Sequence, residues 1–230
     1  MKKQISVIGI ICFGIILFIG SISENNPTEP GRNCYEKISE YSGIVSEKYQ
    51  SDNDYYKESL SVDRFSENEK QSYMCRDDIY AVGNNIAISK AEIQQYMDFY
   101  LNDGKDEKEA YQLAVKDAKE RNALYVAAIQ NGYDVTDEEI HTWLSELRNI
   151  LENDTSGVYQ AALEGFDSEE AYWTYEFEVY RIDLPIQNYV SAMQFDLNGA
   201  SETTNNDTEA NSFEAFKHEL AEKQEFEETD

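Results

Sequence analysis

Hydrophobic positions in the middle of the chain follow two different periods. Residues 79–82 and 86–88 are short apolar runs on either side of Asn84 and Asn85, and Asn tolerates the positive φ of a tight turn. This pattern predicts two strands that form a β-hairpin. Beyond the hairpin, apolar residues recur every three or four positions, which is the spacing of a helix that buries one face. We expect helices near the following ranges: 90–101, 106–130, 136–151, 158–163 and 168–198.

The ends of these helices carry residues that favour helix boundaries. Residues 89–92 (Ser-Lys-Ala-Glu) and 136–139 (Thr-Asp-Glu-Glu) have the spacing of capping boxes, in which two orphan backbone N–H groups gain side-chain acceptors. Gly132 follows the second helix, and glycine readily takes the left-handed conformation that ends a helix. Pro185 lies inside the last long helix. Because proline removes one intrahelical hydrogen bond, we expect a kink or a restart there.

Polar segments flank this periodic region. Residues 24–77 are acidic and contain several turn-forming residues, so we interpret most of them as a spacer, with helical apolar spacing only over 35–49. Residues 199–211 have the composition of a polar linker. Residues 212–222 return to helical spacing, and we expect a short edge strand over 224–227.

These elements define the expected fold class and the division of the chain. The fold class is mainly α: a helical bundle with a short β-hairpin, completed by a C-terminal helix. We expect an N-terminal segment, an acidic polar spacer, a folded domain, a linker and the C-terminal helix, with these bounds: 1–23, 24–77, 78–198, 199–211 and 212–230.

The N-terminal segment has the pattern of an export signal or of a membrane anchor. Two lysines precede an uncharged, mostly apolar run over residues 5–22. A spanning helix needs about 20 apolar residues, and the core of a cleaved signal peptide has about 7–15, so both alternatives stay open. Positive residues remain cytoplasmic, and residues 24–230 therefore lie outside the cytoplasm. The protein is then a single-pass protein of the cell membrane, or it is secreted if cleavage follows Ser23.

The charge and composition of the chain argue against nucleic-acid binding and in favour of a folded protein. The 230 residues contain 19 Lys and Arg against 46 Asp and Glu, which gives a formal net charge of −27. A sequence-independent nucleic-acid binder needs clustered cations that displace counterions from phosphates, so we exclude nucleic acid as a partner. With 41% hydrophobic residues and 17 tyrosines, the chain has enough apolar surface for a folded core in spite of its charge.

Two cysteines, Cys34 and Cys75, lie in the part of the chain that we place outside the cytoplasm, where disulfides persist. A bond between them would close a loop of about 40 residues, which in the entropic model stabilises a fold by roughly 3–4 kcal/mol. Two free thiols are the alternative, and the sequence leaves both open.

Residue patterns typical of enzymes are missing from the sequence. His141 and His218 lack the spacing of metal ligands, and no stretch has the glycine pattern of a phosphate-binding loop or the serine elbow of a hydrolase. Acidic pairs occur in the first turns of predicted helices, where they favour the helix dipole rather than indicate acid–base catalysis. We therefore expect no enzyme activity, no metal site and no cofactor.

Three stretches and the C-terminal helix resemble the N-terminal domain of SurA-like and PrsA-like chaperones, in the trigger factor/SurA peptide-binding superfamily. Residues 79–93 (IYAVGNNIAISKAEI) are similar to the family's opening strand, Asn-Gly turn, second strand and helix start, although Asn85 replaces the glycine. Residues 128–140 (AIQNGYDVTDEEI) and 165–172 (GFDSEEAY) are similar to the motifs before the family's later helices. Residues 212–226 resemble its C-terminal helix, which packs back on the N-terminal domain. The resemblance covers about half the chain.

The resemblance implies a holdase chaperone that binds unfolded or partly folded exported polypeptides. Family members usually carry a parvulin-type prolyl isomerase domain of roughly 90–100 residues, which cannot fit into the linker 199–211, so isomerase activity is not expected. Large aromatic and methionine side chains give such a module adaptable contacts, and its negative charge keeps the exposed apolar surface soluble. A dedicated binding or assembly protein of the cell envelope, with the same fold and one partner, is the alternative.

Peptide contacts are expected on the apolar faces of the helices. Most residues on such faces are core, and that alternative stays open for every candidate. Tyr175 and Tyr180 are favoured because the last long helix carries aromatic residues on more than one side. The candidate peptide-binding residues are Met97, Tyr100, Trp143, Leu147, Tyr172, Trp173, Tyr175 and Tyr180.

Overall fold

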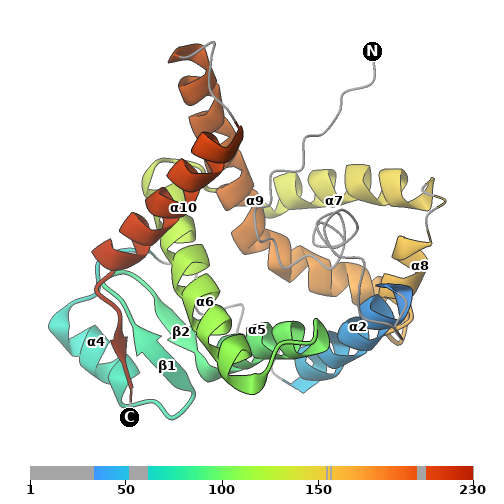
Figure 1. Cartoon of the computed structure of the whole chain (residues 1–230), viewed down its shortest axis with the longest axis horizontal. Coiled ribbons are helices and arrows are strands. Elements are labelled where there is room, and N and C mark those ends of the chain that lie inside the picture. The colour runs from blue at the N-terminus through green and yellow to red at the C-terminus, as the bar shows by residue number, and fades with distance from the viewer. Residues whose placement is uncertain (1–33, 52–61, 154, 156, 201–205, 230) are drawn as a thin grey trace. The chain divides into compact units, whose positions relative to one another are not determined.

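The computed structural model describes residues 34–51, 62–153, 155, 157–200 and 206–229, and its fold is mainly helical with one small antiparallel sheet (Figure 1). The predicted fold class, mainly α with a short β element, is confirmed. The helices are α2 (Cys34–Ser51), α4 (Glu67–Met74), α5 (Lys90–Asn102), α6 (Glu107–Gln130), α7 (Asp137–Glu152), α8 (Val158–Leu163), α9 (Glu169–Ala200) and α10 (Asn206–Lys223). The strands are β1 (Ile79–Val82), β2 (Ala87–Ser89) and β3 (Glu227–Glu228).

The chain forms two compact units, and each is built from two separate pieces of sequence. Unit 1 contains residues 1–53 and 136–183, and unit 2 contains residues 54–135 and 184–230. We expected one domain over 78–198 from the sequence, whereas the division into units cuts that range after Val135 and after Asp183. The second boundary falls two residues before Pro185, where the helix loses one of its backbone hydrogen bonds.

In unit 1, the core lies between the apolar face of α7 and the aromatic face of α9. The capping box at the start of α7 is present as predicted, since Thr136 N donates to Glu139 Oε2 at 2.8 Å and Glu139 N donates to Thr136 Oγ1 at 3.2 Å. From α9, the rings of Tyr172 and Tyr175 pack against Phe166 at centroid distances of 5.3 and 5.5 Å. The buried stripe of α7 consists of Ile140, Leu144, Leu147 and Leu151.

Within residues 24–77, helix α2 lies where the sequence shows helical apolar spacing over 35–49. It lies beside α8 (Figure 1), and its Tyr41 and Val45 side chains are buried. Ser42 Oγ donates a hydrogen bond to the carbonyl oxygen of Ala162. The helical apolar spacing over 35–49 thus marked a packed helix inside a region that was otherwise interpreted as a spacer.

In unit 2, α6 is the central helix, and both α5 and α10 pack against it (Figure 1). Ala110, Ala114 and Ala118 on α6 are completely buried. Small side chains at these positions allow neighbouring helices to approach closely. The predicted end of α6 is confirmed: Gly132 has a φ of 82°, in the left-handed region that ends a helix.

The C-terminal residues complete the sheet of unit 2. Strand order is β2–β1–β3, with β1 antiparallel to both neighbours, and Ala81 and Val82 pair with Glu228 and Glu227 of β3. The β1–β2 pairing is irregular between residues 79 and 81. A short edge strand therefore exists, but it covers Glu227–Glu228 rather than the expected 224–227.

The turn of the hairpin differs from the prediction. Among the described residues, Glu225 alone has a positive φ without being glycine, so neither Asn84 nor Asn85 takes a left-handed conformation. The C-terminal segment holds the turn instead: Asn84 N donates to the carbonyl oxygen of Gln224 at 2.7 Å, and Asn85 N donates to Gln224 Oε1 at 3.1 Å. Asn85 Nδ2 also donates to the carbonyl oxygen of Val62 at 3.0 Å.

Two further boundaries correct the sequence analysis. Helix α9 passes through Pro185 without the restart that was one of the two expected outcomes. It also continues to Ala200, and α10 begins at Asn206, so most of the predicted linker 199–211 is helical and only residues 201–205 lie between the two helices. Polar composition alone does not distinguish a linker from the solvent-facing turns of a helix.

The predicted N-terminal export or anchor segment, residues 1–23, lies outside the described residues. In the part of the chain that the structure describes, no helix has both the length and the apolar character needed to span a membrane.

Candidate functional site

The structure does not place the eight predicted contact residues in one compact unit. Met97 and Tyr100 belong to unit 2, and the other six belong to unit 1. Tyr175 and Tyr180, the favoured candidates, are 1% exposed and form part of the core, so a client has no access to them in this structure. Tyr172 and Leu147 are buried as well. The candidates that keep partly exposed side chains are Met97, Tyr100, Trp143 and Trp173.

Tyr100 has a structural partner in unit 2. Its hydroxyl donates a hydrogen bond to Asp117 Oδ2, and it lies edge-to-face against Phe99 at a centroid distance of 5.1 Å. Burial, followed by the nearby Asp117 carboxylate, raises the pKa of Tyr100 above its ordinary value. Burial likewise raises the pKa of Asp117. The Tyr100 hydroxyl therefore stabilises a mostly buried carboxylate, while the ring remains half-exposed.

The clearest surface arrangement in unit 1 is a line of contacts between α7 and α9, which we call the α7–α9 seam. Arg148 pairs with Glu169, the His141 ring stacks on Phe177 at 4.5 Å, and Arg181 Nη2 lies 2.8 Å from Asp137 Oδ1. The last contact joins the start of α7 to a later part of α9, so these two helix segments run antiparallel. On α9, the seam residues repeat every fourth position: Glu169, Trp173, Phe177 and Arg181.

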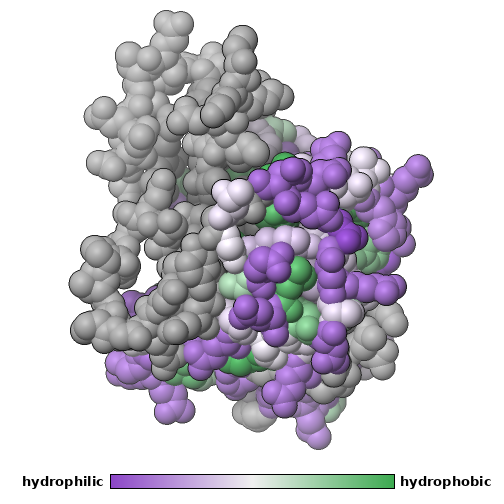
Figure 2. Space-filling view, turned by 90° about the vertical axis from the view of Figure 1, so that its right-hand side faces the viewer, coloured by the Kyte–Doolittle hydropathy of each residue, from purple (hydrophilic) through white to green (hydrophobic). Residues whose placement is uncertain are grey.

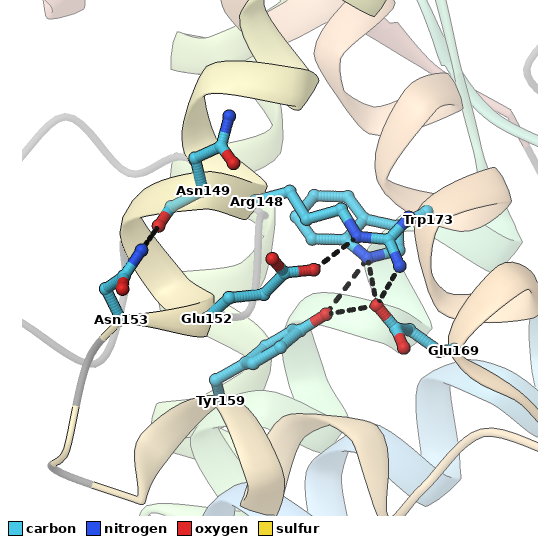
Figure 3. Close-up of polar contacts among 7 residues, drawn as sticks. All are labelled: Arg148, Asn149, Glu152, Asn153, Tyr159, Glu169 and Trp173. Carbon is cyan, nitrogen blue, oxygen red and sulfur yellow. Dashed lines mark hydrogen bonds and ion pairs between the residues drawn. The ribbon is translucent and has the colours of Figure 1, made fainter.

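One end of the seam is a cluster of two aromatic residues and a carboxylate around a guanidinium group (Figure 3). Arg148 pairs with Glu169 through Nη2, and its Cζ atom lies 5.8 Å from the centre of the Trp173 ring. Tyr159 OH donates to Glu169 Oε1 at 2.9 Å, and Trp173 Nε1 donates to Tyr159 OH at 3.0 Å. Three elements, α7, α8 and α9, thus meet at one partly exposed charge cluster.

Electrostatics in this cluster favour a permanently ionised carboxylate. The hydrogen bond from Tyr159 is the largest cause that lowers the pKa of Glu169, and the Arg148 charge lowers it further. In return, burial and the hydrogen bond to Glu169 raise the pKa of Tyr159 to about 12. At neutral pH, Glu169 therefore presents a fixed negative charge, and Tyr159 keeps its proton.

At the other end of the seam, a second guanidinium group, that of Arg181, also lies beside an aromatic ring and acidic side chains. The Arg181 guanidinium lies 5.1 Å from the centre of the Phe177 ring, and it also pairs with Glu178 at 3.5 Å. His141 stacks on the same ring. Helical spacing in the sequence could have identified the α9 residues of the seam, but the matching residues on α7 were hidden because they alternate with the buried leucines.

Unit 2 carries its own cluster of partly exposed rings, which we call the unit 2 aromatic cluster: Tyr133, Tyr189, Phe213 and Phe216. Successive centroids are 5.4, 6.4 and 6.5 Å apart, in the order Tyr133–Tyr189–Phe216–Phe213. The ammonium group of Lys217 lies 5.5 Å from the centre of the Phe213 ring. The cluster joins a loop, α9 and α10, so no periodicity within one element could have revealed it.

Helix α10 is attached to α6 by a buried ionic network. Lys217 Nζ lies 3.1 Å from Glu120 Oε2, and both side chains are almost completely buried. Lys217 also pairs with the more exposed Glu214 at 2.7 Å, and Lys116 joins both acidic residues. Buried charges are tolerated only when they are paired, so this network fixes the position of α10 on α6.

The cysteine and histidine side chains that the structure describes lie apart from any cluster of metal-binding residues. Cys75 is exposed, and the side chain of Cys34 lies outside the described residues, so a disulfide between them and two free thiols both stay open. Among the residues that the structure describes, no group of three or more His, Cys, Asp or Glu side chains is placed to hold a metal ion. His218 lies beside Glu222 at 3.5 Å on an exposed face of α10.

Comparison with family models, curated proteins and solved structures finds no match to this chain. Function must therefore be inferred from the surface of the chain itself. On the face of the molecule in Figure 2, hydrophilic residues predominate, and hydrophobic residues show in small patches between them. The large hydrophobic residues that are exposed within the described part are Leu101, Tyr111 and Ile150. The surface thus carries partly exposed aromatic rings beside charged side chains. Such rings suit weak contacts with polypeptide segments that contain both apolar and cationic residues.

Proposed function

We propose that this protein is an extracytoplasmic holdase, anchored to the membrane or exported by its N-terminal segment, that binds unfolded exported polypeptides without isomerising their prolines. The observation that carries this proposal is the pair of half-exposed aromatic surfaces, the α7–α9 seam and the unit 2 aromatic cluster, in a chain with a net charge of −27. Neither surface has the convergent nucleophile, base and oxyanion donors of a catalytic site.

A holdase needs many weak and adaptable contacts with its unfolded clients, because the clients differ in sequence. Tyrosine and tryptophan supply a large contact area at a low cost in conformational entropy. Several separate aromatic sites on one chain bind one extended client more tightly than any single site does, because the later contacts are intramolecular. The negative charge keeps such a surface soluble, attracts cationic segments and repels other copies of the same protein.

The arrangement of α10 supports the same proposal. The chaperone family that the sequence resembles builds its peptide-binding domain from an N-terminal part and a returning C-terminal helix. In this chain, α10 packs on α6, and β3 pairs with β1. The likeness to that family is one of organisation.

Aggregation assays test the proposal. The purified full chain, in lipid nanodiscs if its N-terminal segment is retained, is added to a chemically unfolded, reduced model protein during dilution from denaturant. We expect slower light-scattering growth at a few-fold molar excess and no acceleration of prolyl isomerisation in a peptide assay. Unchanged aggregation at that excess would exclude a holdase. A pull-down that returns one stoichiometric partner would instead favour a dedicated assembly protein.

Matched variants connect the activity to the surfaces. Tyr133→Ser and Phe177→Ser each remove one partly exposed ring from a different unit, and we expect each to weaken the suppression of aggregation. Ile150→Ser removes an apolar side chain that is 57% exposed and lies in neither aromatic surface, so it serves as the control. If all three variants behave alike, the rings are not the binding surface.

A further inference from the structure

We propose that the cluster around Glu169 is a binding site for an arginine side chain of the bound polypeptide, and that Arg148 is its built-in occupant. Tyr159, Glu169 and Trp173 form this site, which we call the guanidinium cage (Figure 3). The inference deepens the proposed function, on which it rests, by naming the chemistry of the segment that is bound.

The cage stays built when Arg148 leaves it. Glu169 Oε1 accepts hydrogen bonds from Tyr159 OH at 2.9 Å and from Trp173 Nε1 at 3.4 Å, and neither bond involves the arginine. Tyr159 itself is 5% exposed and fixed on α8. The Trp173 ring packs edge-to-face on the fully buried Tyr172 at 5.2 Å. Carboxylate and indole are therefore preorganised for a cation by groups that belong to the core.

The geometry of the present occupant indicates which cation fits. The Arg148 Cζ atom lies 5.8 Å from the centre of the Trp173 ring and Nη2 donates to Glu169, so one guanidinium group contacts both the indole and the carboxylate. A lysine ammonium has no plane to stack and is more strongly hydrated, so it gains less from an indole beside a carboxylate. We therefore expect the cage to prefer arginine over lysine.

Exchange of one arginine for another is physically easy at this position. The Arg148 side chain is 47% exposed, and its Nε atom already pairs with Glu152 Oε1 at 2.9 Å, one helical turn away on α7. When Arg148 leaves the cage, it keeps this second partner and does not become an unpaired charge. Surface ion pairs are weak, so an incoming guanidinium on a tethered client segment can compete with the internal one.

Binding of short labelled peptides to the full chain tests the cage. Three dye-labelled peptides are compared that differ only at one central residue, which is arginine, lysine or the uncharged analogue citrulline. We expect the arginine peptide to bind most tightly and the citrulline peptide most weakly. Arg148→Ala should tighten binding of the arginine peptide about tenfold, since the competing occupant is gone, which corresponds to about 1.4 kcal/mol.

Two further variants separate the cage from general charge effects. Glu169→Gln keeps the size of an exposed side chain and should abolish the preference for arginine over citrulline. Arg64→Ala removes the same charge as Arg148→Ala from an exposed position in unit 2, and it should leave the preference unchanged. The indole N–H signal of Trp173, assigned with Trp173→Phe, should shift only with the arginine peptide.

The outcomes distinguish this inference from the proposed function. If Arg148→Ala fails to tighten binding of the arginine peptide, or if citrulline binds as well as arginine, the cage is not a binding site, even when aggregation is still suppressed. If the arginine peptide binds as expected but aggregation is unaffected, the cage stands and the holdase proposal fails.

Discussion

At the scale of single residues, alanine substitutions at two glycines of unit 1, Gly43 and Gly165, are expected to change the stability of the protein in opposite directions. A Cβ atom on Gly165 would overlap the backbone of Ser42 and Gly43 in α2, whereas a Cβ atom on Gly43 would meet nothing within 4 Å. We expect Gly165→Ala to destabilise unit 1 by about 1–3 kcal/mol, because overpacking forces the backbone to shift. Gly43→Ala should stabilise the helix by about 0.5–1 kcal/mol.

Denaturant unfolding of the two variants checks this expectation. The signal should come from unit 1, for example from the fluorescence of its tryptophans Trp143 and Trp173. If Gly165→Ala unfolds at the same denaturant concentration as the parent protein, then α2 does not pack as closely on residue 165 as the structure indicates.

At the same scale, four of the eight predicted contact residues, Leu147, Tyr172, Tyr175 and Tyr180, are buried in the structure. Helical spacing correctly placed Tyr172, Tyr175 and Tyr180 on a common helix, but spacing gives the direction of a side chain and not its depth. The buried face of α9 also contains Glu176 and Asp183, both 1% exposed, which a hydrophobic stripe cannot reveal. For Tyr172, Tyr175 and Tyr180, the structure therefore favours the core alternative that the sequence left open.

At the scale of elements, attachment of α10 depends on one buried cation. Lys217→Met leaves Glu120 buried, with only the more distant Lys116 beside it at 3.6 Å. Removal of one partner from a buried ion pair typically costs about 3–5 kcal/mol, so α10 should detach from α6 more readily. Hydrogen exchange measures this directly, as faster exchange in the described part of α10.

Two additional variants test the cause of that effect. Lys223→Met removes an exposed lysine from the same helix, where it pairs with exposed Glu219, and should change little. Glu120→Gln combined with Lys217→Met removes the stranded charge and should recover much of the loss. If the double variant is as unstable as Lys217→Met alone, packing of the lysine stem matters more than its charge.

The hairpin turn gives a prediction that opposes the usual preference for Asn-Gly. Glycine is favoured in tight turns because it accepts a positive φ, but Asn85 has none, and its side chain holds the carbonyl oxygen of Val62. Asn85→Gly should therefore destabilise unit 2 by about 1–2 kcal/mol, from one lost hydrogen bond and a more flexible unfolded chain. Thermal unfolding checks the sign: a stabilised variant would contradict the described turn.

Element boundaries were predictable where capping residues mark them. The starts of α5, α6 and α7 follow Ser89, Asp106 and Thr136, each of which accepts the expected backbone hydrogen bond. The start of α10 was not predictable, because its polar sequence carries no comparable start signal, whereas α2 begins and ends within two residues of the helical spacing over 35–49. The role of the Asn84–Asn85 turn as the docking point for residues 223–225 depends on a contact across about 140 positions, which local sequence cannot encode.

At the scale of the whole molecule, acidic residues make stability depend on pH. Hydrogen bonds or cationic partners lower the pKa of several carboxylates in the folded state: Glu69, Asp78, Glu139, Glu169, Glu214, Glu219 and Glu228. A carboxylate with a lowered pKa binds its proton more readily when the chain unfolds. Its contribution to stability is therefore complete above the unfolded pKa and is lost as the pH falls through the folded value. Asp117, whose pKa is raised by burial, acts in the opposite direction.

Because carboxylates with a lowered pKa outnumber Asp117, stability should fall as the pH drops below about 4.5, the ordinary pKa of glutamate. The midpoints of chemical unfolding, measured between about pH 7 and pH 3, show this loss of stability in acid, which we call the acid limb. Glu69→Gln and Glu139→Gln, which remove the acidic partners of two capping boxes, should together make it shallower. Glu138→Gln changes an exposed neighbour in the same helical turn without touching the capping box and should leave the slope unchanged. If Glu138→Gln changes the dependence of stability on pH as much as the two capping-box variants do, overall charge rather than these particular hydrogen bonds governs the response to acid.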